Sequence, residues 1–260
     1  MSKMRVCYFD IETSPHKAYV WRLYDENVGL NQLIEVSRVI CAAWQFEQDG
    51  HVEPMQFAAE WETPGDEYVA VGGHGVMVDK IHRALSEADA VVHYNGTSFD
   101  ERHLNREFIQ AKHDPPARYQ TIDLYLAIKR KFTFASAKLE QVSKELGIRK
   151  GKLHTDFTLW RDVLAGDDKA QRQMQKYNEE DVRLLVDLYH ELLPWIDRHP
   201  NVALYEGDEQ VRCTHCGSTD VTKYGFSRTS AGTFQRYSCR ECGSQSRGSV
   251  RLASTPLREG

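Results

Sequence analysis

Two carboxylates stand close together near the start of the chain, within residues 7–13. The β-branched and aromatic residues of this segment predict a strand. Side chains alternate between the two faces of a strand, so Asp10 and Glu12 share one face and lie about 7 Å apart. Like charges at such a separation repel each other unless a cation lies between them. The pair therefore indicates half of a divalent-metal site, and the alternative is a strand that ends in solvent.

Further carboxylates follow in two later segments. Apolar residues at steps of three and four predict a long amphipathic helix over residues 168–195, with Asp181 in its buried stripe and Tyr177 one turn earlier. A buried Asp is costly unless it is paired or metal-bound. The alternative is an exposed acidic cluster at residues 179–181. Asp100 follows a short apolar strand in the first turn of a helix, a common active-site position, although it could merely complement the helix dipole.

Taken in this order, the segments resemble the DEDD superfamily of 3′→5′ exonucleases, in its tyrosine-containing DEDDy branch. The matching motifs are residues 9–13, 95–100 and 177–181. The sister branch has a His five residues before the last Asp, where this chain has Lys176. The resemblance covers residues 4–195 and implies an α/β fold of the ribonuclease H type, with a mixed five-stranded sheet flanked by helices.

The resemblance also implies the chemistry of the site. Two Mg²⁺ or Mn²⁺ ions about 4 Å apart would activate a water and stabilise the departing 3′-oxygen. Tyr177 would orient the water, because a phenol with a pKa of about 10 is better suited to positioning than to deprotonation. Asn95 would contact a metal-bound carboxylate or the terminal nucleotide, and capping of the preceding strand is an equal alternative. The implied metal ligands are Asp10, Glu12, Asp100 and Asp181.

The intervening sequence predicts the elements that place these residues. Residues 36–46 form an apolar run, Asp49-Gly50 signals a hairpin turn, and residues 51–58 return, so an antiparallel meander is expected. Residues 14–31, with several aromatic rings, are expected to be irregular. Ser98 and Glu101 match a capping box, which predicts a helix that starts after Ser98.

Four of the six cysteines form two Cys-x-x-Cys-Gly motifs separated by 22 residues. Two such pairs predict a structural zinc site, with disulfides as the alternative that a reducing compartment disfavours. Strands over residues 221–226 and 234–239 complete a resemblance to a zinc ribbon, in which zinc supplies much of the folding free energy. The expected zinc ligands are Cys213, Cys216, Cys239 and Cys242.

The charge is divided unevenly along the 260 residues. The net charge is −5, but residues 211–260 carry eight basic and three acidic side chains, so the first 210 residues carry −10. A basic segment with arginines and aromatic rings predicts nucleic-acid binding, and protein docking is the alternative. With no apolar run of membrane-spanning length and no signal peptide, the expected location is cytoplasmic, in the host cell if a bacteriophage encodes the chain.

The predicted organisation is an exonuclease domain over residues 1–200, a linker over 201–210, a zinc ribbon over 211–245 and a disordered tail over 246–260. This combination is similar to stand-alone nucleases of bacteriophages and bacteria. We expect a metal-dependent 3′→5′ exonuclease that prefers DNA, with single-stranded ends favoured, and a replication or repair protein as a further partner. The alternatives are a structure-selective endonuclease, an RNA-trimming enzyme, or a nucleic-acid-binding protein with an inactive nuclease scaffold.

Overall fold

A computed structural model describes residues 3–62, 72–148, 155–230 and 232–255. The chain divides into two compact units, which are treated separately. The larger unit is Arg5–Asp187, and the smaller one combines Met1–Met4 with Leu188–Gly260. The division falls within the last long helix, α6 (Asp168–Leu192), whereas the sequence predicted a boundary at residue 200.

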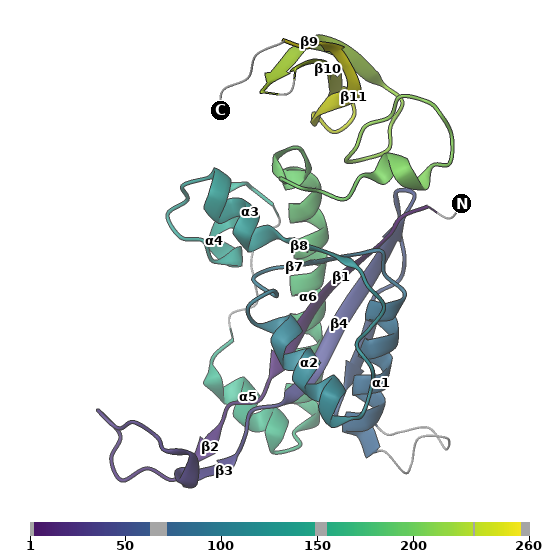
Figure 1. The fold of residues 1–260 in the computed structure, drawn as a ribbon. Coiled ribbons are helices and arrows are strands. Elements are labelled where there is room, and N and C mark those ends of the chain that lie inside the picture. Colours follow the sequence, from purple (N-terminus) through teal and green to yellow (C-terminus); the bar gives the residue numbers. More distant parts are fainter. Residues whose placement is uncertain (1–2, 63–71, 149–154, 231, 256–260) are drawn as a thin grey trace. The chain divides into compact units, whose positions relative to one another are not determined.

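The larger unit is built on a mixed sheet of six strands in the order β5-β4-β1-β7-β8, with β6 also paired to β4 (Figure 1). β1 runs antiparallel to β4 and parallel to β7, and β7 runs parallel to β8. The predicted meander and mixed sheet are confirmed. The returning strand is split into two pieces around Pro54, which gives six strands where five were expected. The strands are β1 (Arg5–Thr13), β4 (Val39–Gln48), β5 (His51–Val52), β6 (Gln56–Ala59), β7 (Ala90–His93) and β8 (Gln120–Asp123).

Helices cover both faces of this sheet. Phe9 and Ile11 of β1 pack in one core cluster with Ile81 of α1 and Phe108 of α2. On the opposite face, residues of α5 and α6 form a second cluster, in which Met174 is fully buried. The alternation of β1 therefore directs Asp10 and Glu12 away from α1 and α2. The other helices of the larger unit are α1 (Gly72–Ser86), α2 (Asp100–Gln110), α3 (Leu124–Lys131), α4 (Leu139–Glu145) and α5 (Phe157–Leu164).

The start of α2 differs from the predicted capping box. The helix begins at Asp100, and its N-cap residue is Phe99. The Ser98 hydroxyl instead donates to the Asn95 side chain at 2.8 Å, and the Glu101 carboxylate accepts from the Thr121 hydroxyl. Ser98 therefore bonds within the tight turn after β7 and Glu101 bonds to Thr121, so the two residues do not form a capping box.

A two-stranded arm projects from the larger unit between β1 and β4 (Figure 1). It contains β2 (Lys17–Ala18) and β3 (Leu33–Glu35), where an irregular segment was expected. The Glu26 carboxylate accepts from the backbone N–H groups of residues 21 and 22, and it also accepts from the Gln32 amide. Polar side chains thus hold the loop together, while Trp21 is 95% exposed.

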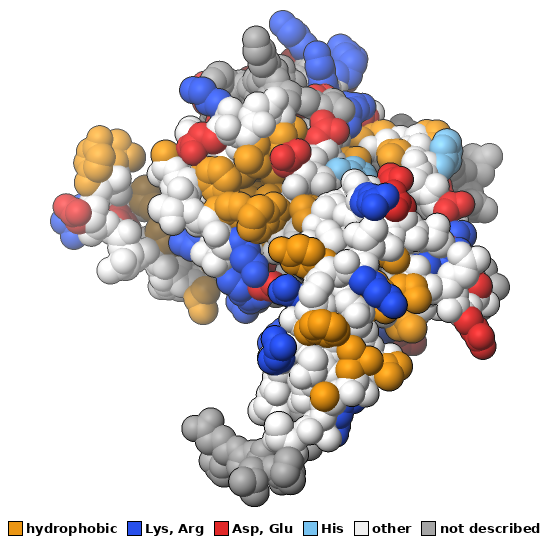
Figure 2. Space-filling view, turned by 90° about the horizontal axis from the view of Figure 1, so that it is seen from above, with side chains coloured by type: hydrophobic (Ala, Val, Ile, Leu, Met, Phe, Trp, Pro, Cys, Tyr) orange, Lys and Arg blue, Asp and Glu red, His pale blue; other side chains and the backbone are white. Residues whose placement is uncertain are grey.

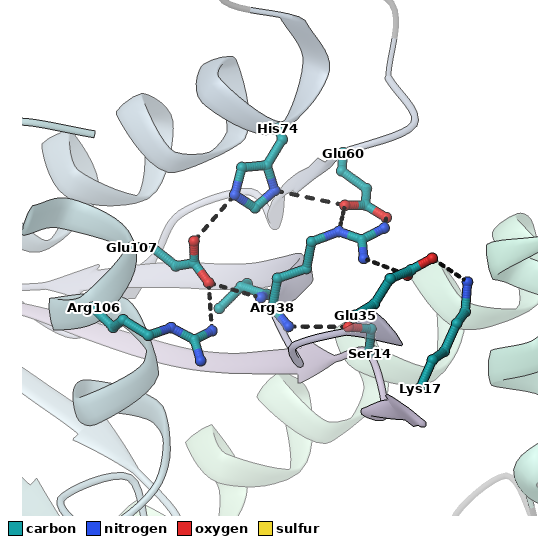
Figure 3. Close-up of polar contacts among 9 residues, drawn as sticks. Ser14, Lys17, Glu35, Arg38, Glu60, His74, Arg106 and Glu107 are labelled. Atoms are coloured by element: carbon teal, nitrogen blue, oxygen red, sulfur yellow. Dashed lines mark hydrogen bonds and ion pairs between the residues drawn. The ribbon is translucent and has the colours of Figure 1, made fainter. Parts of the chain in front are cut away.

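A network of charged side chains lies where the arm joins the sheet (Figure 3). Arg38 donates two hydrogen bonds to Glu60, at 2.7 and 2.9 Å, and pairs with Glu35 of β3. His74 of α1 lies between Glu60 and Glu107 of α2. Bidentate arginine pairs have defined geometry, so this network fixes the base of the arm to β6 and, through His74, to α1 and α2.

The smaller unit contains a three-stranded antiparallel sheet. The predicted hairpin is present as β9 (Val221–Thr229) and β10 (Gly232–Cys239). A third strand, β11 (Gln245–Ala253), pairs with β10, so the prediction of disorder from residue 246 is wrong for this stretch. Residues 256–260 of the predicted tail lie outside the described residues. Two short 3₁₀ turns precede the sheet, at Leu193–Trp195 and Val202–Tyr205.

Candidate metal centre

Three of the four predicted acidic ligands come together in the larger unit. Carboxylate oxygens of Asp10, Glu12 and Asp181 all lie within 4.8 Å of one another. Strand β1 contributes the first two, and α6 contributes Asp181, which is only 6% exposed. Asp10 and Glu12 are half-buried, and three converging carboxylates fit a hard divalent cation such as Mg²⁺ or Mn²⁺.

A β-bulge lies next to these carboxylates. Glu12 pairs with Cys41 and Thr13 pairs with Val39, which leaves Ile40 as an extra residue of β4. A bulge bends the strand and redirects the neighbouring side chains. The bulge thus lies at Glu12, the second carboxylate of β1, where the strand ends and the chain continues into the arm.

Asp100 is placed slightly apart from this group. Its carboxylate accepts a hydrogen bond from the backbone N–H of Ile11 at 3.3 Å, between the two acids of β1. The side chain is almost completely buried, and burial raises its pKa to about 6 despite the opposing influence of His93. Asp100 therefore contacts the strand that carries two of the candidate metal ligands, but it does not belong to the group of three.

Asn178 is a site residue that the sequence analysis missed. It lies next to Tyr177 on α6, is fully buried, and donates its side-chain amide to the Asp10 carboxylate at 2.7 Å and to the Asp10 carbonyl at 3.2 Å. The signal was available, because position 178 lies three residues before Asp181 on the same side of the helix. The predicted buried face of the helix included Tyr177 but not Asn178.

The turn after β7 determines where Asn95 lies. Asn95 has a φ of 66°, and its N–H donates to the Asp123 carboxylate at 3.0 Å. Its side-chain oxygen accepts from Ser98, and among the described residues it bonds to none of the four predicted acidic ligands. A contact with metal-bound carboxylates stays a prediction, and the turn geometry supports the structural alternative. Asp123 caps α3 by accepting from the N–H of Leu126.

Tyr177 is positioned by packing and lies beside open space. Its ring is 8% exposed and meets Trp160 of α5 edge to face, with centroids 6.2 Å apart. Four residues separate it from Asp181, which places both on one side of α6 about one turn apart. Tyr177 also lines a cavity of about 680 Å³. Packing therefore holds the tyrosine one helical turn from Asp181, in the wall of this cavity.

The cysteines of the smaller unit form a second group of ligands. All four sulfurs lie within 4.8 Å of one another, with Cys213 to Cys242 at 3.5 Å and Cys216 to Cys239 at 3.6 Å. These separations exceed the S–S bond length of about 2.05 Å and approach the roughly 3.8 Å expected between thiolates around tetrahedral zinc. The residues fit a closed metal site. His215 is not a fifth ligand, since its Nε2 bonds to the Ile196 carbonyl at 3.2 Å.

Comparison with known proteins supports the fold. A sequence profile of the RNase H superfamily matches residues 69–193, which include α1 to α6 but not β1. The larger unit has an RNase H-like fold, with a mixed sheet flanked by helices. Nucleases with this fold use divalent metals, and a nucleic acid is the corresponding substrate class. No curated protein matches the chain. In the described part of the chain, no helix has the length and hydropathy needed to cross a membrane.

Proposed function

We propose that the larger unit is a metal-dependent 3′→5′ exonuclease that acts on DNA, with a preference for single-stranded ends. The convergence of Asp10, Glu12 and Asp181, with Tyr177 one helical turn away, is the observation that carries this proposal. A metal-binding group on its own would not need a buried phenol beside it. The order of these residues along the chain is also that of the DEDDy exonucleases.

Each side chain has a role that follows from its position. Asp10, Glu12 and Asp181 would hold the metal, with Asp100, which accepts from the backbone of β1 between Asp10 and Glu12, as a further ligand. Bound divalent ions would supply a water of lowered pKa and stabilise charge on the phosphate. Tyr177 would orient the attacking water through its hydroxyl. Asn178 holds the carboxylate of Asp10 in place by donating its side-chain amide to it.

Three nucleic-acid substrates distinguish this activity from that of an endonuclease, an RNA-trimming enzyme or an inactive scaffold. Purified protein with Mg²⁺ or Mn²⁺ would receive 5′-labelled single-stranded DNA, the same sequence as RNA, and a circular single strand. We expect a ladder that shortens from the 3′ end of DNA, and its loss in Asp10→Ala and Asp181→Ala. Cleavage of the circle would contradict the proposal in favour of an endonuclease. Preferential trimming of RNA would contradict the choice of DNA, and binding without cleavage would indicate a scaffold.

We also propose that the smaller unit binds one zinc ion and contacts nucleic acid. Exposed rings on β9 include Tyr224, which is 57% exposed, and Phe226, which is 49% exposed. The guanidinium of Arg236 lies 5.1 Å from the Tyr224 ring centre, and that of Arg247 lies 4.5 Å from the Phe234 ring centre. Rings for base stacking next to charges for phosphates are typical of single-strand binding. Figure 2 shows hydrophobic and basic side chains interspersed on the face in view.

Substitutions on this sheet test its proposed contact with nucleic acid. Tyr224→Ala combined with Phe226→Ala should weaken binding of a fluorescent single strand about tenfold or more, because each stacked base contributes. Val250→Ala is the matched control, since Val250 is 71% exposed on β11, at the other edge of the same sheet, and offers no ring. Equal affinity of both variants and the wild type would remove nucleic acid as the ligand of this sheet.

A further inference from the structure

The arm between β1 and β4, residues 14–38, concentrates exposed hydrophobic side chains. Among the described residues, 21 large hydrophobic side chains are exposed, and nine of them lie between residues 19 and 36. The most exposed of the nine are Tyr19, Trp21, Leu23, Tyr24 and Leu30. An apolar surface of this kind, held in water by a folded protein, marks an interaction site.

Hydrogen bonds hold this surface in a defined shape. The Glu26 carboxylate accepts from the backbone N–H groups of residues 21 and 22, at 2.9 and 2.8 Å. The Gln32 amide donates to Glu26 at 2.8 Å and to the Tyr19 carbonyl at 2.9 Å. The charged network in Figure 3 fixes the base of the arm to the sheet. A surface that is already ordered loses little conformational entropy when a partner covers it.

The two strands of the arm form a small sheet of their own. β2 pairs with β3 at two positions, Lys17 with Glu35 and Ala18 with Leu33. A two-stranded sheet on its own is marginally stable in water, and it gains stability when further strands or an apolar surface pack against it. The outer edges of such a sheet also offer backbone groups to another strand. These properties favour a partner that covers the arm.

Charge favours a second copy of this chain as the partner. Residues 14–38 carry three basic and three acidic side chains, whereas the larger unit as a whole carries a net charge of −7. Two copies therefore repel each other over the rest of this unit but not at the arm. Because the arm projects from the unit, two arms can meet while the acidic surfaces stay apart (Figure 1).

The same charges disfavour nucleic acid as the partner. Phosphates bind to basic side chains that are available to them. Lys17 pairs with Glu35 at 2.8 Å, and Arg38 pairs with Glu60 at 2.7 Å. Two of the three basic side chains of the arm are thus already neutralised by carboxylates.

The area of the arm matches that of a stable dimer contact. Aromatic side chains bury about 150–250 Å² each, so Tyr19, Trp21 and Tyr24 offer roughly 500 Å² per copy. With the aliphatic side chains of the arm, the apolar area reaches about 800 Å² per copy, which is what each partner buries in a standard interface.

We propose that the arm is a dimer interface, in which the arms of two copies of this chain pack against each other about a two-fold axis. A two-fold contact uses the same surface of both subunits, so that surface has to be apolar and must not repel itself. The arm meets both conditions. This inference does not depend on the proposed nuclease function.

Sedimentation velocity of the full-length protein tests the interface. Between about 0.5 and 50 µM, the wild type should change from monomer to dimer, with a dissociation constant in the micromolar range or below. In Trp21→Ser/Leu30→Ser, the dissociation constant should rise at least about tenfold, because two of the most exposed apolar groups are lost. A wild type that stays monomeric over the whole range would overturn the proposal.

A matched control removes an exposed hydrophobic side chain outside the arm. Ile109 is exposed on α2, so Ile109→Ser should dimerise like the wild type. Equal weakening in Ile109→Ser would overturn the assignment to the arm. Thermal unfolding at about 0.5 µM checks that each variant is folded. Leu23→Ser/Tyr24→Ser is a second, independent pair on the arm, and a wild-type dissociation constant in this pair would also overturn the proposal.

Mixtures distinguish contact between two arms from other contacts. Labelled Trp21→Ser/Leu30→Ser should stay monomeric in an excess of unlabelled wild type, because both arms are needed. A mixed dimer would overturn the arm-to-arm arrangement, since the arm would then bind another part of the second copy. If the wild type is monomeric and the variant binds a labelled DNA duplex more weakly than the wild type does, the arm contacts nucleic acid and the proposal is wrong.

Discussion

The side-chain amide of Asn178 donates to the carboxylate of Asp10 at 2.7 Å, across 168 positions of the chain. This bond joins the middle of α6 to the end of β1, and a second one, to the Asp10 carbonyl, fixes the same strand. The other atom of the amide, Oδ1, is buried and has no hydrogen-bond partner in the described structure. Asn178 therefore fixes the orientation of a candidate metal ligand.

Replacing Asn178 should weaken the metal centre more than it weakens the fold. In Asn178→Ala, we expect the apparent affinity for Mn²⁺ to fall about tenfold to a hundredfold, as for other groups that orient metal ligands. The measurement is the Mn²⁺ dependence of the hydrolysis of the p-nitrophenyl ester of thymidine 5′-monophosphate, with thermal unfolding recorded in parallel. Asn105→Ala, on the exposed side of α2, should leave the titration unchanged. A normal Mn²⁺ dependence in Asn178→Ala would exclude this role.

His74 should make stability depend on pH. Its hydrogen bond to Glu107 and its ion pair with Glu60 raise its pKa from 6.5 to about 9, so the folded protein holds a proton that the unfolded chain releases more easily. The resulting stabilisation is complete below pH 6.5 and disappears as the pH rises through about 9. The free energy of unfolding from urea titrations should therefore decline over this interval.

Variants at His74 and at an exposed histidine separate this contribution from other titrations. In His74→Gln, the decline between pH 6.5 and 9 should become shallower, because no proton is taken up at this position. His51→Gln, at an exposed position in β5, should retain the wild-type slope. The same slope in all three proteins would show that the network in Figure 3 does not hold a protonated histidine.

Gly96 should tolerate no side chain. A Cβ atom at this position would lie 2.4 Å from the ring of His93, which is fully buried and accepts the Gly96 N–H. We expect Gly96→Ala to lower the free energy of unfolding by roughly 1–3 kcal/mol, as in other overpacked cores, and to displace the turn that precedes Asp100. Urea unfolding measures the first effect and Mn²⁺ affinity the second. Thr97→Ala, one residue later and exposed, should be neutral.

Removal of zinc should unfold the smaller unit alone. Metal analysis should find one zinc per chain, and a chelator should abolish the order of residues 213–253, because a sheet of this size has little core of its own. After Mn²⁺ is added back, the larger unit should still hydrolyse the p-nitrophenyl ester of thymidine 5′-monophosphate. Cys216→Ser should lose zinc, and His215→Gln should keep it, since His215 bonds to a backbone carbonyl. Zinc retained in Cys216→Ser would contradict a four-cysteine site.

The sequence was sufficient to predict the fold and the candidate site where the local pattern of residues agrees with their chemistry. Alternation placed Asp10 and Glu12 on one face of β1, and helical spacing placed Tyr177 and Asp181 on one side of α6. The resemblance to DEDDy exonucleases predicted that these acids converge, and the cysteine spacing predicted the second cluster. It was insufficient where tertiary contacts decide. Ser98 bonds back to Asn95 instead of capping α2, a choice that depends on the turn around Gly96. β11 is polar and glycine-containing, and its order comes from pairing with β10.

The arm between β1 and β4 has a consequence for concentrated solutions of the protein. Tyr19, Trp21 and Leu30 are between 76% and 95% exposed, and the arm's internal hydrogen bonds keep them in water. Short-range attraction between molecules should therefore depend on this arm more than on the net charge of −5. Trp21→Lys should make the second osmotic virial coefficient more positive at an unchanged unfolding temperature, so the colloidal behaviour of the protein can be altered separately from its fold.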